Sequence, residues 1–302
     1  MTATAKEALL EIGPDIPGPS RVRAAMHLDF SRDFATGSTF LAASFQQPPL
    51  KVVRAFSLED GGALAHLHNA SGGLLGGDNL ALEINLGCRT SVQLTTTGAT
   101  RIYRQRPEFS PTTQQNKVTV GEGALLEYLP DALIPFADAH FQQSTSIDLA
   151  AGAGLFWWEI LAPGREARGE LFEYEQFEMR TRVSALGRKI AMENICLRPA
   201  ARDVSSISRL GPYRYIATFY MCRVGLGESE WRALEDRLHD FAGSMALRDE
   251  VLWGISSLVA HGLVARCLAR HGRDVLPGLH TLWREAKLRL YGREAVPPRK
   301  VN

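Results

Sequence analysis

Two histidines and an aspartate beside a glycine-rich stretch are the side chains best suited to bind a metal ion. His66 and His68 are two residues apart, so both side chains lie on the same face if the segment is a strand. Imidazole nitrogens suit transition metals, and Asp78 could complete such a site. One hypothesis is therefore a metal-dependent hydrolase that uses His66, His68 and Asp78. The alternative is a pair of hydrogen-bonded or surface histidines, which a lone His-x-His pattern favours.

The segment before Asp78 reads Gly-Gly-Leu-Leu-Gly-Gly, and its glycines permit a positive φ or a very close approach of another segment. These glycines are Gly72, Gly73, Gly76 and Gly77. Consecutive backbone amides can bind a phosphate, but an alternating strand rather than a helix follows, so no helix N-terminus is available. A structural turn in which Asp78 accepts hydrogen bonds from nearby amides is therefore the favoured interpretation.

The elements that would position these residues have a period of two from Arg21 to about Arg223. In one example Leu80, Leu82 and Ile84 alternate with polar residues, as in a half-buried strand. Glycine-containing turns lead into several such strands at intervals of 31 to 35 residues. The turns contain Gly87, Gly121 and Gly123, Gly152 and Gly154, and Gly187. This spacing indicates a repeated β unit that stacks into a layered or helical sheet.

The pattern changes to a helical period after Gly227. It predicts helices over residues 229–243, 247–270 and about 281–291, the last ended by Gly292. We therefore expect a mainly β fold with a small C-terminal α-helical part. A Pro/Gly-rich tail over residues 1–20 precedes a single domain over 21–302, whose β body ends at about 227 and whose helical segment covers 228–302.

Composition and charge exclude several classes of protein. The net charge of the 302 residues is +1, which leaves no basic excess for binding nucleic acid. Phosphate-loop, nucleophile-elbow and zinc-protease motifs are missing, which counts against an enzyme. No secretory signal is visible, and the most apolar window, residues 253–269, is interrupted by His261 and Arg266. We expect a cytoplasmic protein that binds neither nucleic acid nor membrane, with four reduced cysteines.

An ordered set of motifs resembles the urease accessory protein UreD family, called UreH in some organisms. The set comprises the glycine-rich loop at 72–78, then 96–100 with the pair at 103–104, 127–136, 164–170, 254–266 and 297–299. The residues that carry the resemblance most directly are Gly72, Gly73, Gly76, Gly77, Thr97, Gly98, Tyr103, Arg104, Gly164 and Arg165. The chain departs from the pattern at Ala70-Ser71 and in a long insert at 106–115.

The resemblance implies a mainly β protein of stacked, helically arranged sheets that is not an enzyme. It implies a maturation chaperone that binds urease apoprotein and UreF, and UreG through UreF, with a possible homo-oligomer formed through that complex. Nickel would pass through an internal polar passage toward urease, in transit rather than as a tightly bound cofactor.

Weak oxygen donors suit such a passage, because thiolates and clustered imidazoles would trap the ion. We therefore expect the nickel path to be lined by Asp78, Glu127, Asp131 and Glu170, with His66 and His68 as further candidate ligands. The alternative for each carboxylate is a buried ion pair with Arg101, Arg104 or Arg165, whose loss would appear as unfolding.

Overall fold

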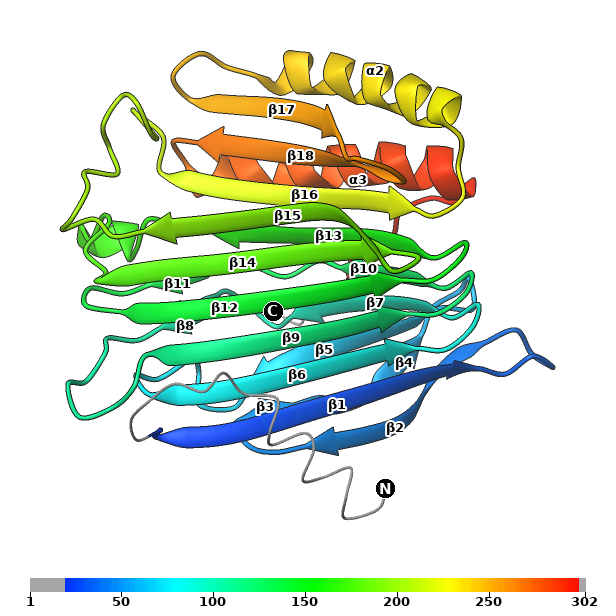
Figure 1. Cartoon of the computed structure of the whole chain (residues 1–302), viewed down its shortest axis with the longest axis horizontal. Helices are drawn as coiled ribbons and strands as arrows, with labels where there is room; N and C mark the ends of the chain where they lie inside the picture. Colours follow the sequence, from blue (N-terminus) through cyan, green and yellow to red (C-terminus); the bar gives the residue numbers. More distant parts are fainter. Residues whose placement is uncertain (1–19, 299–302) are drawn as a thin grey trace.

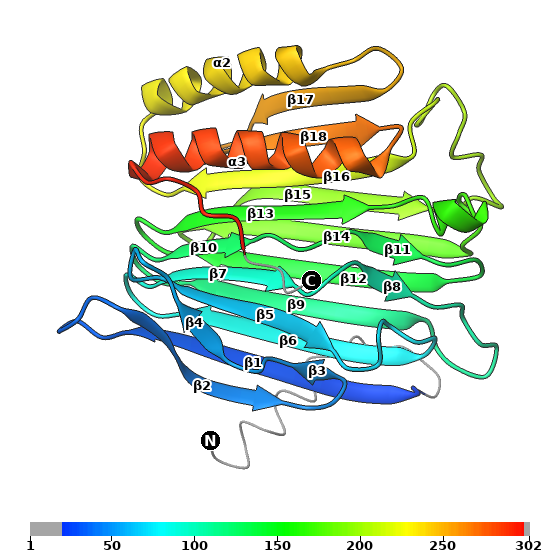
Figure 2. The ribbon, with the colours of Figure 1, turned by 180° about the vertical axis from the view of Figure 1, so that it is seen from behind.

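Two β-sheets stack face to face in the computed structural model, which describes residues 20–298 (Figures 1 and 2). Within this part of the chain, one sheet contains, in spatial order, β15 (Arg188–Leu197), β14 (Gln176–Ala185), β12 (His140–Leu149), β9 (Thr112–Val120), β6 (Asp78–Leu86), β1 (Val22–Arg32) and β2 (Thr39–Gln46). We call it sheet A. Its strands β1, β6, β9, β12 and β14 are parallel, whereas β2 and β15 are antiparallel to their neighbours at the two edges.

The second sheet, here called sheet B, contains more strands than sheet A. Its strands are β17 (Val251–Ser257), β18 (Gly262–Ala269), β16 (Tyr215–Arg223), β13 (Gly154–Leu161), β10 (Leu125–Tyr128), β7 (Ser91–Thr96), β5 (Ala63–Asn69) and β3 (Leu50–Lys51), with β4 (Ala55–Ser57), β8 (Thr100–Ile102) and β11 (Leu133–Pro135) beside this path. Two short 3-10 helices, η1 (Glu166–Arg168) and η2 (Gly272–Asp274), lie in connections. The predicted mainly β fold with stacked sheets is confirmed.

Three of the four predicted glycine turns carry the chain from sheet A to sheet B. They join β6 to β7, β9 to β10 and β12 to β13. Each repeat therefore adds one strand to each sheet, parallel to the strand that the previous repeat added. The fourth turn, at Gly187, is instead a hairpin that joins β14 to β15 within sheet A. The repeated unit therefore ends one strand earlier than the glycine spacing predicts.

The alternating strands bury one face between the sheets. β6 follows the prediction, with Leu80, Leu82 and Ile84 buried and the intervening residues only partly so. In the interior, the ring of Tyr128 stacks on that of Trp157 with centroids 3.9 Å apart. A separate apolar cluster lies on the other face of sheet B, where two helices cover it (Figure 2).

The helices are α2 (Glu228–Met245) and α3 (Val275–Tyr291), and they confirm the first and third predicted helices. Gly292 ends α3 with φ +63°, as expected. The predicted helix over 247–270 is wrong, because this segment forms the antiparallel strands β17 and β18. The segment 228–302 is therefore not wholly helical.

The physical reason for this error is that β18 pairs with β16 and so extends an existing sheet. Pairing with a sheet that is already folded satisfies the backbone of both strands and outweighs helix propensity. The described helices include none that is long and apolar enough to cross a bilayer. The predicted N-terminal tail falls almost entirely on residues outside the described part of the chain.

Candidate functional site

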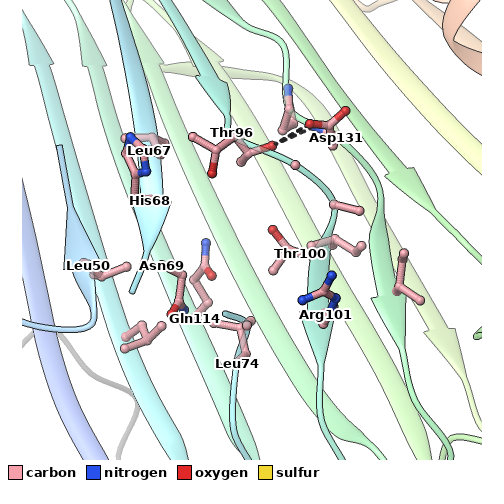
Figure 3. A pocket seen from close by; sticks show the side chains of 18 of the residues that line it. Leu50, Leu67, His68, Asn69, Leu74, Thr96, Thr100, Arg101, Gln114 and Asp131 are labelled. Atoms are coloured by element: carbon pink, nitrogen blue, oxygen red, sulfur yellow. Dashed lines mark hydrogen bonds between the residues drawn. The ribbon is translucent and has the colours of Figure 1, made fainter. Parts of the chain in front are cut away.

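A cavity of about 370 Å³ lies between the two sheets (Figure 3). Sheet A contributes Leu80, Leu82, Gln114 and Gln143 to its wall. On the opposite side the wall consists of His68 from β5, Tyr128 from β10 and Glu159 from β13. The glycine-rich loop and the connection over residues 97–99 complete the lining, so segments far apart in the sequence form one site.

The pairing of Thr96 with Asp131 fixes the position of a carboxylate in this wall (Figure 3). The backbone N–H of Asp131 donates to Thr96 Oγ1 at 2.9 Å, and that hydroxyl lies 3.4 Å from Asp131 Oδ2. Burial lowers the pKa of His68 in the same wall, and the nearby His66 and Lys51 lower it further. The wall thus combines the Asp131 side chain with an imidazole whose lowered pKa favours its neutral form.

The glycine-rich loop packs directly against the strand that follows the Thr-rich segment. The Leu74 N–H donates to the Arg101 carbonyl at 2.8 Å, and the Tyr103 N–H donates back to the Leu74 carbonyl at 2.8 Å. A Cβ atom at Gly73, where φ is +154°, would lie 2.5 Å from the Arg101 carbonyl oxygen. The close approach that the glycines predicted is therefore confirmed at this position.

Asp78 has the turn role that the sequence favoured. Its Oδ2 accepts a hydrogen bond from the Leu75 N–H at 2.9 Å, whereas Oδ1 is buried without a hydrogen-bond partner among the described residues. Burial raises the pKa of this carboxyl, and the Leu75 N–H and Arg21 oppose the shift. Asp78 does not line the cavity.

A line of hydrogen-bonded polar side chains, which includes Gln114, Gln143 and Glu159 of the cavity wall, runs through the interior between the sheets. Gln114 donates to Asn116 Oδ1 at 2.9 Å, and Asn116 donates to Thr145 Oγ1 at 3.0 Å. The Gln143 amide lies 3.4 Å from the same hydroxyl and also donates to Glu159 Oε1. These inward positions of sheet A would be apolar in an ordinary β-sandwich core.

Glu159 is the carboxylate of this line. Its side chain is 6% exposed, and it forms no ion pair within residues 20–298. Thr181 donates to Oε2 at 3.1 Å. Burial raises the pKa of Glu159 to about 7, although the hydrogen bonds from Thr181 and Gln143 oppose the shift. Sequence reasoning missed this residue, because it stands in an otherwise apolar strand.

Glu193 of β15 lies beyond Glu159, at the open side of the sandwich. Its carboxylate accepts a hydrogen bond from the Tyr220 hydroxyl at 2.7 Å and one from Arg266 Nε at 2.9 Å. Its negative charge is one of the factors that raise the pKa of Glu159. The polar interior is therefore flanked by a carboxylate at each end, Asp131 on the cavity side and Glu193 on the other.

Two other predicted carboxylates lie outside the cavity and form ion pairs. Glu127 faces the helical side of sheet B, where Lys287 Nζ lies 2.7 Å from Oε1 and Trp283 Nε1 donates to Oε2 at 2.7 Å. Glu170 pairs with Arg165, whose Nε donates to Oε2 at 2.7 Å. The ion-pair alternative thus holds for Glu170 with Arg165, whereas the partner of Glu127 is a lysine that the sequence analysis did not name.

Of the six candidate metal ligands, only His68 and Asp131 line the cavity. The rings of His66 and His68 lie 6.5 Å apart on one face of β5, as their spacing predicted. Within the described residues, no group of three or more His, Cys, Asp or Glu side chains could hold a metal ion. The site geometry required by the metal-dependent hydrolase is therefore not formed by His66, His68 and Asp78.

The other motif residues build the walls around the cavity. Gly72, Gly73, Thr97 and Gly98 line it directly. Tyr103 packs edge-on against Phe136 with ring centroids 4.9 Å apart, and the Arg165 guanidinium lies 4.2 Å from the same ring. The remaining motif glycines allow close approach: Cβ atoms at Gly76 and Gly164 would lie 2.6 Å from the Arg104 carbonyl and 2.7 Å from the Glu170 carbonyl.

The raised pKa of Glu159 predicts a specific pH dependence of stability. Because its folded-state pKa of about 7 exceeds the ordinary value of 4.5, the folded protein retains a proton that the unfolded chain releases between these two values. This contribution is fully present below pH 4.5 and is lost as the pH rises through 7, by roughly 3 kcal/mol. Urea unfolding from pH 5 to pH 8 should show a flatter profile for Glu159→Gln, whereas equal slopes would contradict the prediction.

Comparison with known proteins gives a consistent family assignment. A sequence profile described as "UreD urease accessory protein" matches residues 22–302. A protein of Herpetosiphon aurantiacus named "Urease accessory protein UreD" is 47% identical over 278 residues, covering 91% of this chain and 96% of its own length. Another of the same name, from Pseudomonas paraeruginosa, is 32% identical over 287 residues, covering 95% of this chain and 97% of its own.

Proposed function

Since the chain belongs to the UreD family of urease accessory proteins, we propose that it passes nickel to urease during maturation of the enzyme. In this proposal the chain works in the cytoplasm, binds urease apoprotein and UreF, and receives nickel from UreG through UreF. Any homo-oligomer would form through that complex. Nickel is the cargo in transit, and the chain needs no tightly bound cofactor.

The observation that supports this proposal is the polar line between the sheets. Burying amides, hydroxyls and an unpaired carboxylate costs stability, so an interior of this kind is expected where a function requires it. Apart from the carboxylates of Asp131, Glu159 and Glu193, the donors are oxygen atoms of neutral amides and hydroxyls, which bind a transition metal weakly enough to release it. We propose that nickel passes Asp131, Gln143, Glu159 and Glu193.

The lining role of Asp78, Glu127 and Glu170 stays a prediction, as does a ligand role for His66. In the structure Asp78 caps a turn, while Glu127 and Glu170 are ion-paired, so each has a partner that competes with a metal ion. Family membership also sets the hydrolase hypothesis aside, because the family comprises accessory proteins of urease and not enzymes.

The test is to co-express the chain with urease and the other accessory proteins. Glu159→Gln keeps the shape of the side chain and removes its negative charge. We expect urease activity and its nickel content to fall about tenfold, while complex formation is retained. Asp148→Asn is the matched control, because this exposed carboxylate lies on the outer face of β12. Full nickel loading with Glu159→Gln would contradict the proposed route.

A further inference from the structure

The two sheets end at different places on one side of the sandwich. β15 is the edge strand of sheet A and pairs only with β14, so its other edge has no backbone partner within residues 20–298. In sheet B, β16 is followed by β18 and then β17, which continue beyond β15 (Figure 1). A position for one more strand of sheet A is therefore vacant, with β18 and β17 behind it.

The face of sheet B behind this vacant position is partly apolar. Arg266 of β18 points toward sheet A, because it contacts Glu193 of β15. By the alternation of strands, Leu268 and its antiparallel neighbour Leu252 share this face. Leu252 is 43% exposed. An added strand would bury such side chains as well as satisfy the free backbone groups of β15.

The charge around this edge indicates the chemistry of the missing strand. The β14–β15 hairpin, residues 176–198, contains five cationic residues and two carboxylates. Glu178 and Glu193 are already paired with Arg180 and Arg266. Arg188 and Lys189, at the start of β15, form no ion pair within the described part of the chain. A second copy of the same edge would pair with it antiparallel and bring Arg188 and Lys189 close to the exposed Arg198 of the other copy, which disfavours self-pairing.

We propose that the free edge of β15 binds an extended, acidic segment of a partner protein as an added strand of sheet A. The inference rests on the proposed function, since the partner belongs to the urease assembly. Main-chain hydrogen bonds would supply affinity, while acidic side chains facing Arg188 and Lys189 would set the choice of partner.

Hydrogen–deuterium exchange on the complete complex with urease apoprotein and UreF tests the strand addition. Amides of β15 that point to the free edge should exchange at least tenfold more slowly in the complex than in the free chain. The other edge strand of sheet A, β2, is an internal control and should not change. A complex in which β15 exchanges as in the free chain would overturn the strand addition and leave the nickel route untouched. Protection of β15 in a complex that delivers no nickel would support the strand addition and overturn the nickel route.

Charge reversal tests the acidic character of the partner. Arg188→Glu with Lys189→Glu should weaken binding of the partner proteins about tenfold, with a smaller dependence on salt concentration. Arg232→Glu with Arg289→Glu is the matched control, because these exposed residues lie on α2 and α3, which cover the face of sheet B that is turned away from sheet A. Unchanged affinity after reversal at 188 and 189 would overturn the acidic segment.

Discussion

Replacing Lys287 with methionine should lower the free energy of unfolding by about 3–5 kcal/mol. The Lys287 and Glu127 side chains are only 4% and 2% exposed, and their charged atoms lie 2.7 Å apart. Without the ammonium group, Glu127 would keep only the hydrogen bond from Trp283 in a site closed to water. Burial raises the pKa of Glu127 while Lys287 opposes the shift, so the variant should also take up a proton on folding.

The double variant Glu127→Gln with Lys287→Met separates a buried charge from a loss of packing. If the cost comes from an unpaired carboxylate, removing that carboxylate should recover most of the lost stability in urea unfolding. Arg289→Met is the control on the same helix, because Arg289 is 61% exposed and pairs with Glu285 at the surface. A double variant as unstable as Lys287→Met would show that the methionine itself is not accommodated.

This ion pair illustrates what the sequence could not predict. Glu127 and Lys287 are 160 residues apart, and only the packing of α3 on sheet B brings them together. The alternation of Leu80, Leu82 and Ile84 is a local property of β6, and so the β layers could be predicted from it. The segment that forms β17 and β18 has apolar residues that also fit one face of a helix. It forms strands because β18 pairs with β16, a contact that is distant in sequence.

Only part of the candidate site could be predicted, again because local sequence patterns do not reveal contacts between distant residues. The loop residues around Gly73 and Gly98, and Asp131, came from local motifs, and they do line the cavity. Glu159 follows two tryptophans in a strand that is buried throughout, and nothing in that stretch of sequence indicates that Glu159 is part of a polar cavity wall. Its role depends on the side chains of Gln143 and Thr181 across the interior, which no local pattern reveals.

Gly73→Ala should destabilise the protein by about 3 kcal/mol, because overpacking and an unfavourable positive φ act together. The added methyl group would lie 2.5 Å from the Arg101 carbonyl oxygen and 2.8 Å from the Tyr103 ring. Relief requires the glycine-rich loop to move away from the strand that it pairs with through Leu74. Because Gly73 lines the cavity, we expect the same displacement to change the shape of the nickel route.

Gly98→Ala is the control, since Gly98 lines the same cavity but has no other atom within 4 Å of the added Cβ and no positive φ. Urea unfolding should place Gly98→Ala within about 0.5 kcal/mol of the parent chain. Co-expression with urease should then show reduced nickel loading for Gly73→Ala alone. Equal stability of the two variants would contradict the view that the close contact with Arg101 holds this wall of the cavity in place.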